Sequence, residues 1–121
     1  MKIQIYNLIF LLLFIKHRYE FMKGIVYLLC DGERFKIGMT KGKIEKRIME
    51  LQTGNPNEIW LHSYYETNYP LKIEKMMHNR YKIANVKNEW FDLSVQQVIN
   101  FKTECIKCET ILNSLKFNPF I

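Results

Sequence analysis

The sequence is poor in the residues that mark several classes of protein. It contains 3 cysteines, 5 glycines and 3 prolines in 121 residues. Three cysteines cannot build a disulfide scaffold, which favours a reducing compartment. The low glycine and proline content excludes a collagen-like fibre, and a hydrophobic content of 48% excludes a disordered tail. A chain of this length has room for one main domain.

Long hydrophobic runs are also missing, with one short exception near the start. Leu8–Ile15 are eight consecutive apolar residues, followed by Lys16–Arg18. A membrane-spanning helix needs about 20 apolar residues, so this run is too short. Three interpretations stay open: a helix packed on the domain, a membrane anchor or uncleaved signal, and a translated upstream stretch with Met22 as the biological start. We favour the last and predict that residues 1–21 are an extension outside the domain, because a self-contained pattern begins at Lys23.

Acidic residues are too few to balance the basic ones. Lys and Arg number 18 against 12 Asp and Glu, which gives a formal net charge of +6. Such a balance suggests nucleic acid or an acidic surface as a partner. Lysines outnumber arginines 14 to 4, and Ile and Asn are abundant, as an AT-rich genome would encode. The arginine positions are therefore more informative than the lysine positions.

Periodicity predicts a mixed fold of class α/β (α+β). Strands are expected at residues 24–30, 34–40 and 58–66, helices at 43–53, 70–83 and 94–115, and a short extended piece at 90–93. The domain is placed at residues 22–93, followed by a C-terminal helix within 94–121, for which Ser94 is a candidate N-cap. The side chains of that helix expected to face the core are Val95, Val98, Ile99, Ile106 and Leu112.

Asp31-Gly32 is typical of a two-residue hairpin turn between the first two strands. That turn would place Tyr27 directly opposite Lys36, on the less apolar face. An ammonium beside a phenol favours the phenolate and would lower the pKa of Tyr27, which would make it a poised base. A tyrosine on a half-buried face, covered by a lysine stem, is the structural alternative.

Arg47 lies at the border of the apolar stripe formed by Ile44, Ile48 and Leu51 on the first expected helix. Its guanidinium suits a phosphate, because its fork can bind two oxygens. The segment from Arg34 to Arg47 holds six basic residues and one acidic residue. It could bind a phosphate backbone or form an ordinary solvated face. The DNA-binding candidates are Arg34, Lys41, Lys43 and Lys46.

Glu74 lies at the edge of an apolar helical stripe, with His78 one turn later on the same side. One Glu with waters and phosphate oxygens is a normal Mg²⁺ site. A structural Glu–His hydrogen bond is the alternative. Cys105 and Cys108 form a single C-x-x-C pair, which is a weak zinc signal and is more typical of incidental core or surface cysteines.

In this order and spacing, the segments resemble the GIY-YIG nuclease superfamily. Gly24–Tyr27 is similar to its first motif and Lys36–Gly38 to its second. Arg47 matches the helix arginine of the superfamily, and Glu74 matches its metal-binding glutamate. Asn88–Phe91 looks most like the branch with phage and large-virus DNA-binding domains and the fungal meiotically up-regulated relatives.

The resemblance covers about residues 23–93 and implies a three-stranded antiparallel sheet flanked by helices. It also implies DNA cleavage with one Mg²⁺ or Mn²⁺ ion. Tyr27 would help to deprotonate water, Glu74 would hold the ion, and Arg47 would stabilise charge on the phosphate. Gly24 and Gly38 would be structural motif residues, with Gly38 allowing close backbone passage. Lys36 is counted with the catalytic set, and His78 and Asn88 as accessories; all four catalytic residues are expected to face a shared groove.

Two departures keep a second function open. Lys36 stands where the second motif usually has Tyr, and Leu51 stands where many nucleases place His or Tyr. The leading hypothesis is an endonuclease or nickase, and its rival is a DNA-binding module that has lost cleavage. The third is a membrane-tethered interaction domain using residues 8–15. We expect DNA as the partner, no small-molecule cofactor, and a location in the cytoplasm or nucleus.

Overall fold

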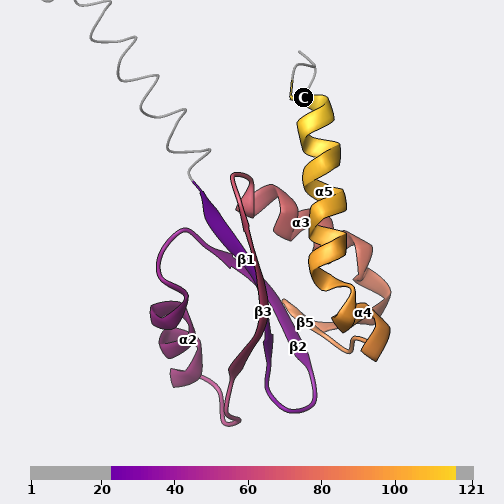
Figure 1. Cartoon of the computed structure of the whole chain (residues 1–121). Helices are drawn as coiled ribbons and strands as arrows, with labels where there is room; N and C mark the ends of the chain where they lie inside the picture. Colours follow the sequence, from indigo (N-terminus) through magenta and orange to yellow (C-terminus); the bar gives the residue numbers. More distant parts are fainter. Residues whose placement is uncertain (1–22, 117–121) are drawn as a thin grey trace, which may run out of the picture.

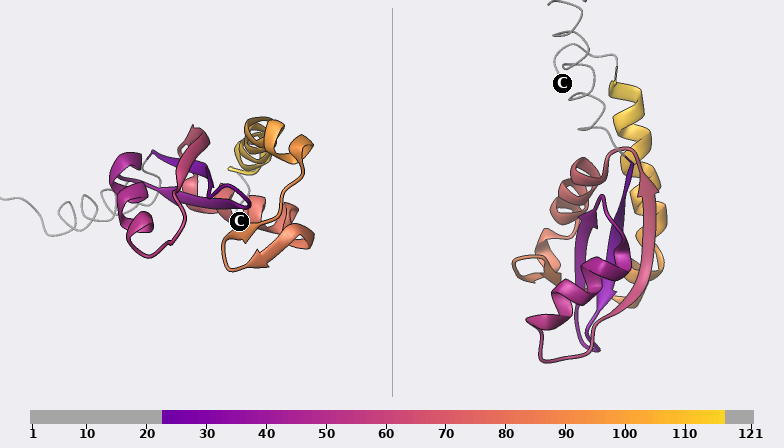
Figure 2. Two further views of the ribbon diagram at one scale, coloured as in Figure 1. Left: turned by 90° about the horizontal axis from the view of Figure 1, so that it is seen from below. Right: turned by 90° about the vertical axis from the view of Figure 1, so that its left-hand side faces the viewer.

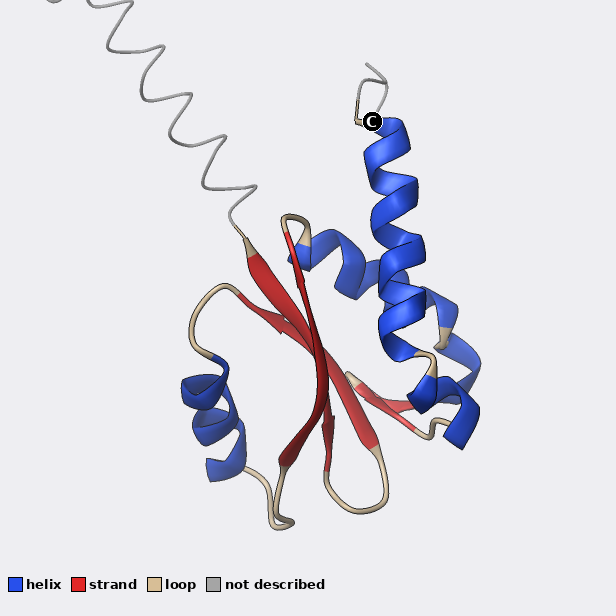
Figure 3. Ribbon diagram, viewed as in Figure 1, coloured by secondary structure: helices blue, strands red, loops and turns tan. Residues whose placement is uncertain are grey.

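The computed structural model describes residues 23–116, which form one antiparallel sheet with helices on both faces (Figures 1 and 3). The strand order is β3-β1-β2-β5-β4. The strands are β1 (Gly24–Cys30), β2 (Phe35–Thr40), β3 (Trp60–Thr67), β4 (Asn85–Lys87) and β5 (Trp90–Phe91). The helices are α2 (Ile44–Thr53), α3 (Pro70–Arg80), the 3₁₀ turn η1 (Lys82–Ala84), α4 (Val95–Ile99) and α5 (Phe101–Leu115). The expected extension at residues 1–21 lies outside the described residues.

The fold class is confirmed, but the expected three-stranded sheet is wrong because the described sheet has five strands. The two extra strands are a short hairpin in which β5 pairs with β2 through Phe91 and Trp90. Asn88 makes its tight turn with a positive φ of 52°. Strands of two and three residues are too short to show alternation in the sequence.

The first hairpin is wider than predicted. Tyr27 pairs with Gly38, and Lys36 pairs with Leu29, so the predicted pairing of Tyr27 with Lys36 is wrong. The Asp31 carboxylate accepts hydrogen bonds from the backbone N–H groups of Glu33 and Arg34, at 3.0 and 2.8 Å. This Asp-centred turn holds a four-residue loop. The register moves by two residues, so the predicted faces of both strands are kept.

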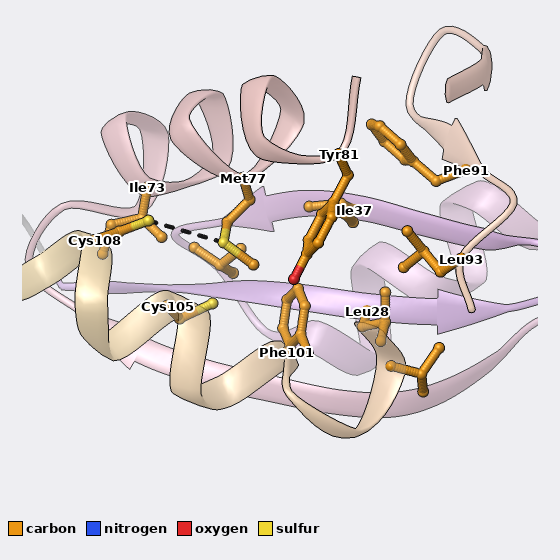
Figure 4. Packing of buried hydrophobic residues seen from close by; sticks show 12 residues of the cluster. Leu28, Ile37, Ile73, Met77, Tyr81, Phe91, Leu93, Phe101, Cys105 and Cys108 are labelled. Carbon is orange, nitrogen blue, oxygen red and sulfur yellow. Dashed lines mark hydrogen bonds between the residues drawn. The ribbon is translucent and has the colours of Figure 1, made fainter. Parts of the chain in front are cut away.

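The two faces of the sheet are covered differently (Figure 2). Helices α3 and α5 pack on the face that carries Val26, Leu28 and Ile37, where they bury a large apolar core (Figure 4). Helix α2 packs on the other face, over a small cluster of Tyr27, Leu29 and Ile59. The α2 side chains in contact with this cluster are Ile44, Ile48 and Leu51, which confirms the predicted stripe.

The C-terminal helix belongs to the main core, and of its five predicted inward residues Val98 and Leu112 are confirmed, whereas Val95, Ile99 and Ile106 are wrong. Phe101, Cys105 and Cys108 are fully buried, whereas Val95 and Ile99 are exposed. The helix is broken at Asn100, which ends α4 and precedes α5. Across the break, the residues that contact the core still follow one stripe of helical spacing, namely Val98, Phe101, Cys105, Cys108 and Leu112. Ser94 is confirmed as the N-cap, in a capping box with Gln97.

The cysteine pair on α5 serves packing. The Cys108 thiol donates to the Met77 sulfur at 3.9 Å (Figure 4). Burial raises the pKa of Cys105 to about 12, so this thiol stays protonated at neutral pH. This confirms the interpretation of the pair as core cysteines. Among the described residues, no group of three or more His, Cys, Asp and Glu side chains is placed to hold a metal ion.

Candidate active site

Tyr27 lies at the centre of the candidate site, on the interior strand β1, and it is fully buried. Its ring lies over Gly38 on the neighbouring strand. A Cβ atom at Gly38 would come within 2.3 Å of the Tyr27 hydroxyl oxygen, far inside any normal contact. Gly38 is therefore required by the phenol that covers it. The structure gives this predicted motif glycine a steric role rather than a special backbone conformation.

Arg47 reaches Tyr27 from α2. Its Nε–H donates to the Tyr27 hydroxyl oxygen at 3.4 Å, and its Nη1 lies 3.5 Å from a Glu50 carboxylate oxygen. The predicted proximity of Arg47 to the hairpin is therefore observed. The hydrogen bond also fixes the guanidinium at the mouth of the site, since its partner belongs to a buried strand.

The phenol of Tyr27 is protonated at neutral pH. Burial raises its pKa above the ordinary value, although Arg47 acts in the opposite direction. Glu89 and Glu74 raise it further. The predicted phenolate beside Lys36 is therefore wrong for the free protein, because desolvation and two carboxylates outweigh the nearby cation.

Lys36 is held away from that role by a different partner. Its ammonium lies 2.8 Å from a Glu89 carboxylate oxygen and 5.5 Å from the centroid of the Trp90 ring. Only 9% of Lys36 is exposed, whereas 36% of the Glu89 side chain is exposed, so the ammonium is desolvated and the carboxylate stays in contact with solvent. Glu89 was not among the predicted site residues. Its signal in the sequence was the compact cluster at residues 88–91, which β5 brings beside β2.

Glu74 comes from α3, the helix on the opposite face of the sheet from α2. Burial raises the pKa of its carboxyl, Glu89 raises it further, and His78 and Lys36 lower it. Glu74 also raises the pKa of Tyr27. The carboxylate thus interacts electrostatically with Tyr27, Lys36 and Glu89, although it belongs to the other layer.

His78 ties α3 to β2. Its Nε2–H donates to the Ile37 carbonyl at 2.7 Å, and the same nitrogen lies 3.8 Å from a Glu74 oxygen. Its ring packs edge-on against Phe91, with 5.1 Å between the centroids. These contacts give His78 a structural role through Ile37 and Phe91, but the expected Glu74–His78 hydrogen bond is not formed, because 3.8 Å is too long. Asn88 likewise has a conformational role in the β4–β5 turn, and its carbonyl accepts from the Asn85 amide at 2.7 Å.

Two hollows adjoin the site on the α2 side of the sheet. The smaller, of about 190 Å³, is lined by Thr40, Gly42, Lys43, Lys46, Arg47 and Glu50. The larger, of about 320 Å³, is lined by Lys36, Glu50, Leu51, Gly54, Asn55, Ile59 and Trp90. Glu74 lines neither of them, so the predicted groove shared by all four catalytic candidates is not observed in these two hollows.

The basic candidates divide into two groups. Lys43 and Lys46 join Arg47 around the smaller hollow at the start of α2. Arg34 lies in the β1–β2 loop, at the opposite end of β2 (Figure 1). A six-residue strand spans about 20 Å, so Arg34 lies well away from Lys43, Lys46 and Arg47. Lys41 is exposed in the loop that leads from β2 to α2.

Comparison with protein-family models matches the T5orf172 domain over residues 24–107. The chain belongs to the T5orf172 domain family. The match begins at β1 and extends into α5, so it includes the helix that completes the core of this T5orf172 domain. The family is phage-associated and related to nuclease-type folds. No curated protein and no solved structure matches the chain. None of the helices within residues 23–116 has the length and apolarity to cross a membrane.

Proposed function

We propose that this T5orf172 domain is a GIY-YIG-type endonuclease or nickase that hydrolyses DNA phosphodiester bonds with one divalent metal ion. The observation that carries the proposal is the Arg47–Tyr27 hydrogen bond at the edge of a basic hollow. Electrostatic interaction of Tyr27 with Glu74 adds the third residue of the set. Membership of a family related to nuclease-type folds supports a role on DNA.

Binding of the DNA backbone falls to the smaller hollow. Lys43, Lys46 and Arg47 present three cations there, and backbone phosphates are the natural ligands of such a group. The guanidinium of Arg47 can hold two phosphate oxygens and stabilise the charge that develops as the phosphorus is attacked. Its hydrogen bond to Tyr27 fixes the distance between the bound phosphate and the phenol.

We infer that Glu74 and Glu89 supply the carboxylates for a divalent cation. Glu89 raises the pKa of Glu74, so the two carboxylates repel each other, and a cation between them would relieve that repulsion. Mg²⁺ commonly uses one or two carboxylates together with waters and substrate phosphates. Mg²⁺ or Mn²⁺ bound there would stabilise negative charge on the leaving oxygen. Glu74 would be the principal protein ligand, because Glu89 is paired with Lys36.

Tyr27, as a protonated phenol, would orient the attacking water. Hydrolysis adds one water across the P–O bond, and the water must be oriented toward the phosphorus. In the free protein the phenol is fully buried and its hydroxyl accepts from Arg47, so it would reach that water once the Arg47 side chain turns to the phosphate. Loss of the hydroxyl in Tyr27→Phe should leave DNA binding unchanged and lower cleavage.

A non-catalytic DNA-binding module is the second candidate. It is favoured by the burial of Tyr27, which raises its pKa, and by the commitment of Lys36 to Glu89. Leu51 contributes an apolar side chain to the cluster under α2, where a nuclease helper would be polar.

A plasmid-nicking assay with Mg²⁺ or Mn²⁺ separates the two candidates. We expect Glu74→Gln to abolish nicking while DNA binding is kept. Arg47→Ala should lower the rate by about 10²- to 10³-fold, the range for loss of one preorganised donor. Arg34→Ala is the arginine comparison: it removes a predicted DNA-binding cation at the other end of β2, so it should weaken DNA binding but lower the cleavage rate far less than Arg47→Ala does.

Binding is measured in parallel over a range of salt concentrations. Each phosphate contact should add about 0.9 to the slope of log K against log salt, so Arg47→Ala should lower that slope by about one contact. Salt-dependent binding without Glu74-dependent cleavage of any DNA form would reject the enzyme and leave the binding module. Binding that does not depend on salt would contradict both.

A further inference from the structure

The larger hollow beside the candidate site has walls of unlike chemistry. Lys36 and Trp90 come from the paired strands β2 and β5, whereas Glu50, Leu51 and Asn55 come from the end of α2 and the loop after it. An aromatic ring, an ammonium and an amide thus face one space of about 320 Å³. A volume of that order falls in the range of small-ligand sites and exceeds the needs of a single ion or water.

The strand wall of the hollow is fixed by the Lys36–Glu89 pair. The ammonium is 2.8 Å from the carboxylate and lies over the half-buried Trp90 ring. The Lys36 ammonium has three N–H donors, and its pairing with one carboxylate does not use all of them. Lys36 can therefore donate to a ligand in the hollow while Glu89 holds it in place.

The loop wall is fixed by Gln52. Its amide nitrogen donates to the Asn57 carbonyl at 2.8 Å and to the Asn55 carbonyl at 3.3 Å. Its amide oxygen accepts from the Ile59 N–H at 2.7 Å. The Asn55 side-chain oxygen accepts from the Asn57 N–H at 3.0 Å, which fixes the orientation of the Asn55 amide. The hollow is therefore built in advance on its loop side.

Glu50 lines both hollows, so the larger one is continuous with the basic surface around Arg47. Arg47 lies 3.5 Å from the Glu50 carboxylate, which balances part of its charge. A DNA strand whose phosphate lies on Arg47 would therefore carry an adjoining base to the entrance of the larger hollow.

We propose that the larger hollow binds one unstacked nucleobase of a DNA strand whose backbone lies on the smaller hollow. The inference rests on the proposed function and names its substrate class: DNA with an unpaired nucleotide beside the scissile phosphate. Indole contacts stabilise a base that has left its stack. Lys36 and the Asn55 amide can donate to acceptors on the base edge, and Glu50 can accept from an exocyclic amino group.

The test measures binding of the full chain to three duplexes of one sequence, in EDTA so that no cleavage occurs. One duplex is perfect, one has a single-nucleotide bulge, and one has a bulge whose nucleotide lacks a base. We expect the bulged duplex to bind about 5- to 100-fold tighter than the perfect one, the range for one base stacked on an aromatic side chain. The abasic bulge should bind like the perfect duplex.

Two variants with matched controls locate the effect. Trp90→Leu keeps an apolar side chain but removes the ring, and it should abolish the preference for the bulge. Trp60→Leu is its control, because Trp60 lies exposed on β3 and does not line the hollow. Asn55→Asp keeps the acceptor for the Asn57 N–H, removes the amide donor and adds negative charge. It should lower the preference several-fold, while Asn79→Asp on the exposed surface of α3 should not.

The outcomes also separate this inference from the proposed function. Equal binding of perfect and bulged duplexes, with Glu74-dependent nicking intact, would overturn the base site and leave the nuclease. Retention of the preference in both Trp90→Leu and Asn55→Asp would overturn it as well. Tighter binding of single-stranded RNA than of DNA of the same sequence would reject DNA as the ligand. If Trp90→Leu does not fold, Asn55→Asp decides the question.

Discussion

The two faces of the sheet differ in what their side chains do. The face under α3 and α5 buries twelve residues in a continuous apolar core, and they come from β1, β2, β5, α3, α4, α5 and the loops between them. The face under α2 buries three, namely Tyr27, Leu29 and Ile59. Around those three lie Lys36, Arg47 and the two hollows. One face therefore supplies most of the apolar burial, and the other carries most of the polar groups of the candidate site.

The separation of an apolar face from a polar face explains why the candidate site can contain so many polar groups. Each desolvated ion or unpaired polar group costs stability, and a small domain has little stability to spare. Helix α2 contains no fully buried residue, so the groups it presents remain close to water. The large core on the opposite face offsets the cost of the Lys36–Glu89 pair and of the buried phenol. The following predictions test this division by measuring each face separately.

Phe101→Ala should have the largest effect. Phe101 is fully buried between α5 and the sheet, and removal of such a ring costs about 3–5 kcal/mol of unfolding free energy. Urea denaturation measures the loss. Ile106→Ala on the same helix is the control, since 52% of Ile106 is exposed, and it should change stability by less than about 0.5 kcal/mol. A similar loss in both variants would show that α5 packs through a different stripe.

Gly38→Ala tests the link between the faces, because its new methyl group would meet the Tyr27 phenol. Overpacking of this kind costs about 1–3 kcal/mol, which should appear as a fall in Tm. DNA cleavage should also fall, since the phenol must move. Gly54→Ala is the control for the change in Tm, because a Cβ atom there meets nothing within 4 Å. A Gly38→Ala protein with unchanged Tm and cleavage would mean that Tyr27 can turn away freely.

Ile48→Ala should cost less than Phe101→Ala, at about 1–2 kcal/mol, because Ile48 is only partly buried under α2. We expect a larger effect on DNA binding than on folding, since Arg47 and the smaller hollow depend on the position of α2. Met49→Ala is the control on the same helix, with 72% of Met49 exposed. Global unfolding of Ile48→Ala, measured by circular dichroism, would show that the α2 face contributes more to stability than its small cluster indicates.

Glu74→Gln should increase stability slightly while it removes cleavage. Burial raises the pKa of Glu74, so the native state holds this proton more tightly than the unfolded chain does. The resulting stability is present below the ordinary Glu pKa and is lost as the pH rises through the native pKa. The Gln side chain does not ionise, so the variant does not lose this stability at high pH. Its free energy of unfolding at pH 7 should be higher by on the order of 0.5–1 kcal/mol. Urea denaturation between pH 4 and pH 8 measures it; a destabilised variant at pH 7 would show that His78 stabilises the carboxylate.

Much of the fold could be predicted from periodicity. The alternation of β1 and β2 gave the correct faces, and the stripe at Ile44, Ile48 and Leu51 gave the inner side of α2. The hairpin register could not be predicted, because the Asp31 side chain widens the loop through its own hydrogen bonds. The inner stripe of the last helix was only partly predicted, because Phe101, Cys105 and Cys108 share it with Val98 and Leu112, and two cysteines give a weaker apolar signal than the exposed Val95, Ile99 and Ile106.

The sequence predicted which residues belong to the candidate site, but not which of them contact one another. Tyr27 and Arg47 do meet, yet Lys36 pairs with Glu89, and the phenol is protonated. Glu89 lies in the turn between two very short strands, so no periodicity along the sequence places it beside β2. The pKa of Tyr27 was expected to be lowered, but burial raises it. That burial depends on segments distant in sequence. The roles of Glu74, Asn88 and the basic residues remain predictions for the experiments above.

The position of α5 over β1 has a consequence for biosynthesis. The strand β1 is made first among the described elements, and the helix that covers its Val26 and Leu28 face is made last. At about 5–20 residues per second, the ribosome needs several seconds to reach that helix. Helix α2, by contrast, follows directly after β2 and can cover its own face early. The face that carries Arg47 and the two hollows is thus able to assemble while the apolar face of the nascent sheet still awaits cover, and in that interval it is the apolar face that offers a binding surface to chaperones.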